Sequence, residues 1–125
     1  MKKDIENRSD IELLVNNFYA KVKADTLIGP IFTDKAKVNW DRHLPMMYDF
    51  WENALFYSGG YFGNPIATHK RLNRMFPLLP DHFQRWRELF LETLDEHFSG
   101  EKASLARQKA MSISALLQIK IKDES

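Results

Sequence analysis

The chain has 125 residues, 44% of them hydrophobic and none of them cysteine, so a single domain spanning 1–125 is expected, without disulfides or thiolate metal sites. Its 18 basic and 17 acidic side chains leave a formal charge of +1, whereas nucleic-acid binding normally requires a basic excess that displaces phosphate counterions. No apolar run is long enough for a membrane span or a secretory signal, so we expect no membrane or nucleic-acid partner and a soluble cytoplasmic protein.

The first predicted helix begins close to the N-terminus. Ser9 and Glu12 have the spacing of a capping box, in which the two side chains accept backbone N–H groups reciprocally. This spacing predicts a helix start at residue 9, with residues 1–8 as a loose extension, and a helix end near Gly29-Pro30. Its apolar positions recur every three or four residues and comprise Ile11, Leu14, Val15, Phe18, Tyr19 and Val22.

The second predicted helix begins after Asn39, a residue type that favours the N-cap. Pro45 lies inside the helical pattern, where it removes a hydrogen bond and clashes with the preceding turn. We therefore expect a bend or a late start within residues 40–44. Two adjoining stripes cover one side of this helix, Trp40-Leu44-Met47-Trp51-Ala54 and His43-Met47-Phe50-Ala54.

Three further helices complete the pattern. Asn64-Pro65 combines a cap residue with proline at the first helical position, and Pro77 ends that segment. Leu79-Pro80-Asp81 opens the next helix, Ser99-Gly100 ends it, and the last begins at about Glu101. The inward positions are Ile66, His69 and Leu72 on the third helix, Phe83, Trp86, Leu89, Phe90 and Leu94 on the fourth, and Ala103, Ala106, Ala110, Ile113 and Leu117 on the fifth. The sequence therefore predicts an all-α fold.

His69 is the first candidate for chemistry. It lies one helical turn from Ile66 and from Leu72, so it faces inward, and a neutral imidazole offers a lone pair to a metal ion. Spacing alone leaves this interpretation open beside another, a buried histidine that bonds a backbone carbonyl.

Tyr19, Trp86 and His43 are the other candidates. Tyr19 and Trp86 each bring one hydrogen-bond donor to an inner helix face, although either alone is equally an ordinary core residue. His43 begins the second helix and is a candidate ligand, gate or acid–base group, or a surface histidine. The chain has no phosphate-binding glycine loop, paired-histidine zinc motif or nucleophile elbow, so a hydrolase is not indicated.

Several segments together resemble the truncated haemoglobins, particularly the third group. The resemblance extends from about Asp10 to the end of the last helix and implies a two-over-two sandwich of helices around haem. The matching segments are Asn17–Val22 with Leu27–Phe32, Phe50-Trp51, Gly63–His69 and His82–Trp86.

This resemblance implies a role for each candidate residue. His69 matches the proximal haem ligand, Tyr19 and Trp86 match the donors that hydrogen-bond a bound gas, and His43 matches the distal-helix histidine. Met47 matches the apolar residue one turn after it. Pro45 departs from the family pattern close to His43, and the stretch between His69 and Trp86 is long for the group. Residues aligned with the haem wall are Phe32, Phe50, Trp51, Leu72, Phe83 and Met111.

The implied function is a globin that holds haem b and binds dioxygen, nitric oxide or carbon monoxide, with an unidentified reductase as partner. Nitric-oxide dioxygenation and peroxidase-like turnover both remain open, and Lys70, Arg71 and Arg74 are candidates for binding the haem propionates. The alternative is a small helical interaction module without haem, since each apolar stripe is also a normal core. A mononuclear metal site of His43 and His69 has little support, because neither a carboxylate nor a cysteine completes it.

Overall fold

The computed structural model describes residues 2–124, with side chains to residue 123. Within this range the chain contains α-helices and one π-helical turn but no β-strand, which confirms the predicted all-α class. No helix in these residues has the length and apolar character of a membrane span. The elements are α1 (Arg8–Ala24), η1 (Ile31–Lys35), α2 (Trp40–Phe56), α3 (Pro65–Met75), α4 (Pro80–His97) and α5 (Glu101–Glu124).

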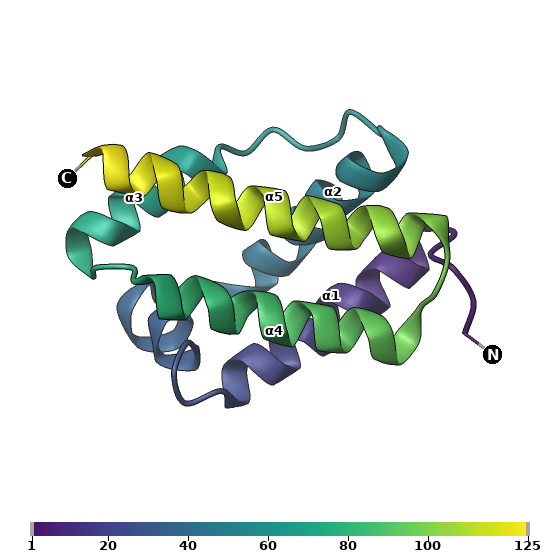
Figure 1. Ribbon diagram of the computed structural model, residues 1–125, viewed down its shortest axis with the longest axis horizontal. Helices are drawn as coiled ribbons and strands as arrows, with labels where there is room; N and C mark the ends of the chain where they lie inside the picture. Colours follow the sequence, from purple (N-terminus) through teal and green to yellow (C-terminus); the bar gives the residue numbers. More distant parts are fainter. Residues whose placement is uncertain (1, 125) are drawn as a thin grey trace.

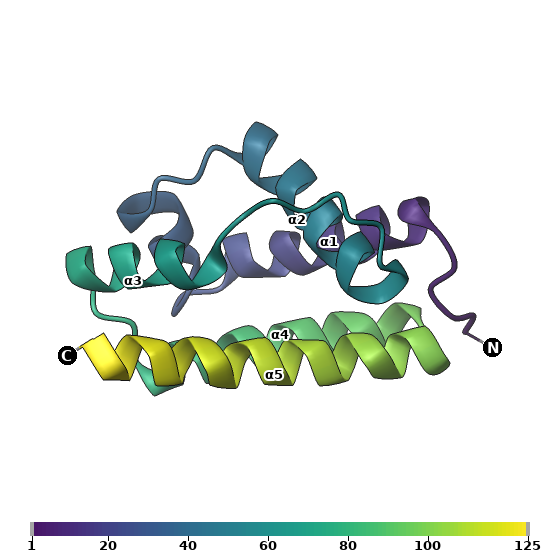
Figure 2. The same cartoon turned by 90° about the horizontal axis from the view of Figure 1, so that it is seen from above.

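Four of the helices form two layers. α4 and α5 run side by side in opposite directions (Figure 1), and α1 and α2 cover one face of that pair (Figure 2). α3 lies outside this four-helix arrangement, beside the C-terminal part of α5. The result is the expected two-over-two arrangement. α2 belongs to one of the two layers, whereas α3 lies beside them.

A stack of aromatic rings forms the centre of the core. Phe90 of α4 is fully buried, and its ring lies parallel to those of Trp51, at 4.7 Å, and Trp86, at 5.6 Å. Phe18 of α1 meets Phe90 edge-on at 5.4 Å. Burying one side chain of this size stabilises the fold by about 1.5–3 kcal/mol. The packing of these rings is therefore a main source of stability between the two layers.

The segment before α1 is not the loose extension that the sequence predicted. Ile5 is only 2% exposed and belongs to the main core. The carboxylate of Asp4 accepts the backbone N–H groups of Lys102 and Ala103, at 2.9 and 2.8 Å, in the first turn of α5. That expectation is therefore wrong for residues 2–7, because the segment both fills the core and satisfies the free donors of a helix start.

The start of α1 also differs from the prediction. Asn7, and not Ser9, is the N-cap: its side-chain oxygen accepts the N–H of Asp10 at 3.0 Å. The Asp10 carboxylate in turn accepts the N–H of Glu6 at 2.8 Å. Asparagine and aspartate side chains accept backbone N–H groups at a helix start as well as serine and glutamate do. The helix therefore begins earlier than predicted, and Ser9 lies inside it.

The sequence predicted that α1 ends near Gly29-Pro30, but the helix ends earlier. The helix stops at Ala24, because the Asp25 carboxylate accepts the backbone N–H groups of the following turn. Gly29 is buried there, and a Cβ at this position would lie 2.8 Å from the carbonyl oxygen of Val22. The chain then forms η1, a π-helical turn that the helical period did not predict.

Pro45 does not delay α2. The helix begins at Trp40, and the Asn39 side chain caps it by accepting the N–H of Asp41 at 3.1 Å. Pro45 therefore lies in the second turn, where its missing N–H leaves the Asp41 carbonyl without its usual intrahelical donor. Of the two expected alternatives, a bend or a late start, the late start is wrong, and His43 lies in the first turn of α2.

Candidate functional site

His69 is held by the first turn of α3. The Asn64 side chain caps this helix by accepting the N–H of Ala67 at 3.0 Å. The Nδ1 atom of His69 lies 2.7 Å from the carbonyl oxygen of Pro65. A carbonyl only accepts, so Nδ1 carries the proton and donates it, and the Nε2 lone pair remains for a metal ion.

The surroundings of His69 favour this neutral form. Burial lowers the pKa of the imidazole, whereas the hydrogen bond to the Pro65 carbonyl raises it, and the net shift is downward. A neutral imidazole is the form that ligates a metal. The two interpretations left open by the sequence are therefore compatible here, because the bond to the carbonyl orients the ring and occupies only one of its nitrogens.

The helix that carries His69 is sparsely covered. No residue of α3 is fully buried, although Ile66 and Leu72 line the same side as His69 and are half-buried. A helix of a globular protein normally buries its apolar stripe against another element. This face of α3 packs only partly, through Leu72 on the main core and through Ile66 on the cluster of Phe83, Leu117 and Ile121.

His43 lies on α2 and contacts Tyr19 of α1. Burial is the main cause that lowers the pKa of His43, and repulsion from His69 lowers it further. The Nε2 atom of His43 lies 3.1 Å from the hydroxyl oxygen of Tyr19. The structure thus brings two of the predicted site residues, Tyr19 of α1 and His43 of α2, into direct contact, while His69 lies on α3.

Tyr19 is the centre of an aromatic cluster. It is 6% exposed, and burial raises the pKa of its hydroxyl, which therefore stays protonated. The rings of Phe32, Trp40 and His43 lie 5.8, 5.4 and 5.1 Å from that of Tyr19. Phe32, predicted to contact haem, reaches this cluster from η1.

Trp40 belongs to the same cluster, although its sequence position predicted only a place on the apolar stripe of α2. Its ring meets that of His43 at 5.6 Å, nearly perpendicular, and the ammonium of Lys23 lies 4.3 Å from the centre of the Trp40 ring. The one available signal was its spacing, because Trp40 precedes His43 by three positions and therefore shares its helix face.

Trp86 approaches Tyr19 less closely. The ring of Phe18 contacts both of them, with its centre 4.8 Å from that of the Tyr19 ring and 5.6 Å from that of the Trp86 ring. Trp86 is half-buried and stacks on Phe90. The tyrosine and tryptophan therefore border the same core region, but only the tyrosine contacts His43.

The remaining predicted residues differ in burial. Phe50 is half-buried and meets Trp51 and Tyr61 edge-on, each at 5.2 Å, while Trp51 itself is 3% exposed in the core. Met47 and Leu72 are half-buried at the edge of the same core. Among the others, Phe83 is 8% exposed and packs with Leu117 and Ile121, Met111 is 45% exposed on α5, Lys70 is half-buried, and Arg71 and Arg74 are exposed on α3.

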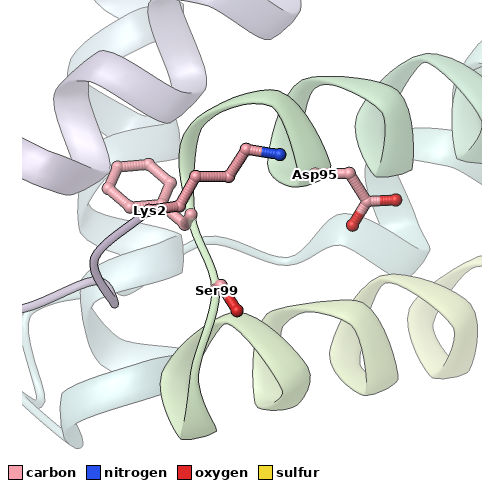
Figure 3. A pocket seen from close by; sticks show the side chains of 4 residues that line it. Lys2, Asp95 and Ser99 are labelled. Atoms are coloured by element: carbon pink, nitrogen blue, oxygen red, sulfur yellow. The ribbon is translucent and has the colours of Figure 1, made fainter.

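The surface also has a shallow depression that is separate from the predicted site residues. It is lined by Lys2, Asp95, Phe98 and Ser99, where the N-terminal segment meets the connection between α4 and α5 (Figure 3). None of the predicted site residues lines it.

Comparison with known proteins decides the family. The chain is 31% identical over 121 residues to the group 3 truncated haemoglobin ctb of Campylobacter jejuni, an alignment that covers 94% of this chain and 93% of the relative. The chain belongs to the truncated haemoglobins. A crystal structure of the group III truncated haemoglobin from the same organism superimposes with a TM-score of 0.83 and 29% identity, and the match covers 97% of this chain and 95% of that one. No family model matches the sequence.

The family resemblance in the sequence is thereby confirmed, and it implies a haem cofactor for this truncated haemoglobin. The residues present fit such a group. His69 offers an oriented Nε2 lone pair, and half-buried Leu72 of α3 together with half-buried Phe32, Phe50 and Met47 provides apolar surface for a porphyrin. Within the described residues no three His, Asp or Glu side chains gather into a metal site.

Proposed function

We propose that this truncated haemoglobin holds haem b between α2 and α3, with His69 Nε2 as the iron ligand. The observation that carries the proposal is the 2.7 Å hydrogen bond from His69 Nδ1 to the Pro65 carbonyl, because it fixes both the tautomer and the ring orientation that ligation requires. The haem would supply an iron that binds dioxygen, nitric oxide or carbon monoxide. The propionates are assigned to Lys70, Arg71 and Arg74 as the nearest basic residues on α3.

On the opposite side of the pocket, the chain would control the ligand through hydrogen bonds. The hydroxyl of Tyr19 and the indole N–H of Trp86 are the proposed donors, His43 is the partner that competes for the tyrosine, and Met47 limits the space one turn further along α2. In a pocket with little water, a hydrogen bond to a partly charged ligand contributes roughly 1.5–3 kcal/mol. That contribution slows ligand release by about one to two decades.

Such slow release fits redox chemistry better than bulk oxygen transport. We propose redox turnover at the haem, with the cytoplasm as its location. In nitric-oxide dioxygenation, bound oxygen would react with nitric oxide to give nitrate, and an unidentified reductase would return the iron to the ferrous state. In peroxidase-like oxidation, hydrogen peroxide would be reduced with electrons from a donor. The two reactions are separated by measuring nitrate formed from nitric oxide in the presence of oxygen against oxidation of a chromogenic donor by hydrogen peroxide.

The visible absorption spectrum of the purified protein tests haem binding. We expect one equivalent of haem to give a sharp Soret band that shifts on reduction and again with carbon monoxide. His69→Gly should lose the normal spectrum and recover it when imidazole is added, since free imidazole then replaces the missing side chain. The matched control is His97→Ala, at the far end of α4, which should keep the wild-type spectrum.

Two results would contradict the proposal. A wild-type spectrum that stoichiometric haem does not change would favour the haem-free helical interaction module. A His69→Gly spectrum identical to that of the wild type, without imidazole, would refute the ligand assignment while leaving haem binding intact.

A further inference from the structure

The connection between α2 and α3 contains one aromatic residue that points inward between two that do not. Tyr57 is 76% exposed and Phe62 is 92% exposed, whereas Tyr61 is half-buried. Burial raises the pKa of the Tyr61 hydroxyl. Because these residues are close in sequence and similar in size, the difference must come from what the Tyr61 ring contacts.

The Tyr61 ring lies between α2 and the residues that lead into α3. On one side it meets the ring of Phe50 edge-on, with centroids 5.2 Å apart and planes at 85°. On the other side it lies directly on Gly63: a Cβ added there would be 2.3 Å from the tyrosine oxygen and 2.5 Å from Cζ. Only a glycine permits the ring to approach the backbone this closely.

The residues after Gly63 perform the two tasks that orient His69. Asn64 caps α3 through the N–H of Ala67, and the carbonyl of Pro65 accepts from His69 Nδ1. A displacement of this short segment would move both the cap and the acceptor. No residue of α3 is fully buried. Its first turn packs through Ile66 against the cluster of Phe83, Leu117 and Ile121, so Tyr61 supplies the contact on the side of α2.

We propose that Tyr61 is a positioning residue for His69: its ring, held against Phe50 of α2 and Gly63, fixes the start of α3 relative to the distal helix. The inference rests on the proposed haem function for its consequence, but the contact itself exists in the haem-free chain. Tyr61 contacts Phe50 and Gly63 and would act on His69 through Gly63, Asn64 and Pro65 rather than as a ligand.

Four variants separate the ring from the loop that carries it. Tyr61→Ala removes the ring, and Gly63→Ala displaces it, so both should loosen the start of α3. Tyr61→Phe keeps the ring and should restore the wild-type behaviour, because the proposal assigns no role to the hydroxyl. Phe62→Ala is the matched control, since it removes an exposed ring from the adjacent position.

Amide hydrogen exchange of the haem-free protein is the first measurement. In Tyr61→Ala and Gly63→Ala, the amides of Ala67, Thr68 and His69 should exchange roughly two- to tenfold faster, the range that corresponds to losing one aromatic pair. The amides of α4 should exchange as in the wild type, which shows that the fold is intact. Wild-type rates at Ala67–His69 in Tyr61→Ala, or an equal increase in Phe62→Ala, would overturn the proposal.

The iron–histidine stretching band of the reduced, haem-loaded protein is the second measurement. Tyr61→Ala should shift or broaden this band, whereas Tyr61→Phe and Phe62→Ala should leave it at its wild-type position. An unshifted band in Tyr61→Ala would overturn the inference while His69 ligation stands. If the wild type binds no haem, the proposed function fails, and the exchange measurement still decides whether Tyr61 holds α3.

Discussion

The Nε2 atom of His43 lies 3.1 Å from the hydroxyl oxygen of Tyr19, so the two polar groups aligned with the distal side already satisfy each other. Burial lowers the pKa of the histidine and raises that of the tyrosine, and both therefore remain neutral. In the tautomer in which His43 Nε2 accepts from the Tyr19 hydroxyl, a gas molecule that accepts a hydrogen bond from Tyr19 would have to compete with His43. The two residues would then act against each other rather than as joint donors.

Exchanging each partner in turn tests that competition. His43→Leu should free the tyrosine hydroxyl and slow oxygen dissociation by about tenfold, whereas Tyr19→Phe should speed it by about tenfold, because one hydrogen bond to a charged acceptor is gained or lost. Stopped-flow displacement of oxygen by carbon monoxide measures both rates. If both variants changed the rate in the same direction, the competition would be disproved.

Trp40 should restrict the movement of the His43 ring. Its ring meets that of His43 at 5.6 Å, so Trp40→Leu removes a wall and should raise the rate of carbon monoxide association roughly two- to tenfold. Flash photolysis gives this rate. Lys23→Ala is the control, because it removes the ammonium on the Trp40 ring and leaves that ring in place; an equal effect there would mean that the ring is not the cause.

Asp4 should contribute to global stability from outside the helices. Asp4→Ala leaves the N–H groups of Lys102 and Ala103 without their acceptor and should lower the free energy of unfolding by about 1–2 kcal/mol, as for loss of an N-cap. Urea unfolding at neutral pH measures the difference. The exposed Asp34 provides the control, and its replacement by alanine should change stability little.

The contribution of Asp4 should depend on pH in a defined direction. Burial raises the pKa of its carboxyl, but three backbone N–H groups, from Lys102, Ala103 and Ile5, outweigh burial and hold it below the ordinary 3.8. A group with a depressed folded-state pKa stabilises the fold above its unfolded value, and that stabilisation is lost as the pH falls through the folded-state pKa. The stability gap between wild type and Asp4→Ala should therefore narrow below pH 3.8; a constant gap would contradict this account.

Gly29 should tolerate no side chain. A Cβ there would lie 2.8 Å from the Val22 carbonyl and 3.1 Å from that of Lys23, and both atoms are backbone that cannot yield easily. Gly29→Ala should cost about 1–3 kcal/mol of unfolding free energy. In Gly60→Ala, the nearest atom to the new Cβ is Ser58 Oγ at 3.6 Å, so thermal unfolding should be close to that of the wild type.

Local signals in the sequence were sufficient for much of the fold. Asn39 and Asn64 cap α2 and α3 as predicted, because a cap is formed by residues two or three positions apart. The inward face that holds His69 also followed from the helical period, and the family resemblance to the truncated haemoglobins came from short segments in a fixed order. These features depend on neighbours along the chain, so the sequence by itself determined them.

Other features depend on residues far apart in the chain, and only the tertiary structure decided them. The choice of Asn7 over Ser9 as cap accompanies the packing of Ile5 into the core, and the Asp4 carboxylate meets α5 at Lys102. The contacts of His43 with Tyr19 and of Tyr61 with Phe50 likewise join different elements. Sequence period identifies which side of a helix faces inward, but the partner it meets is set by how the helices pack, and that packing decides which atoms surround His69.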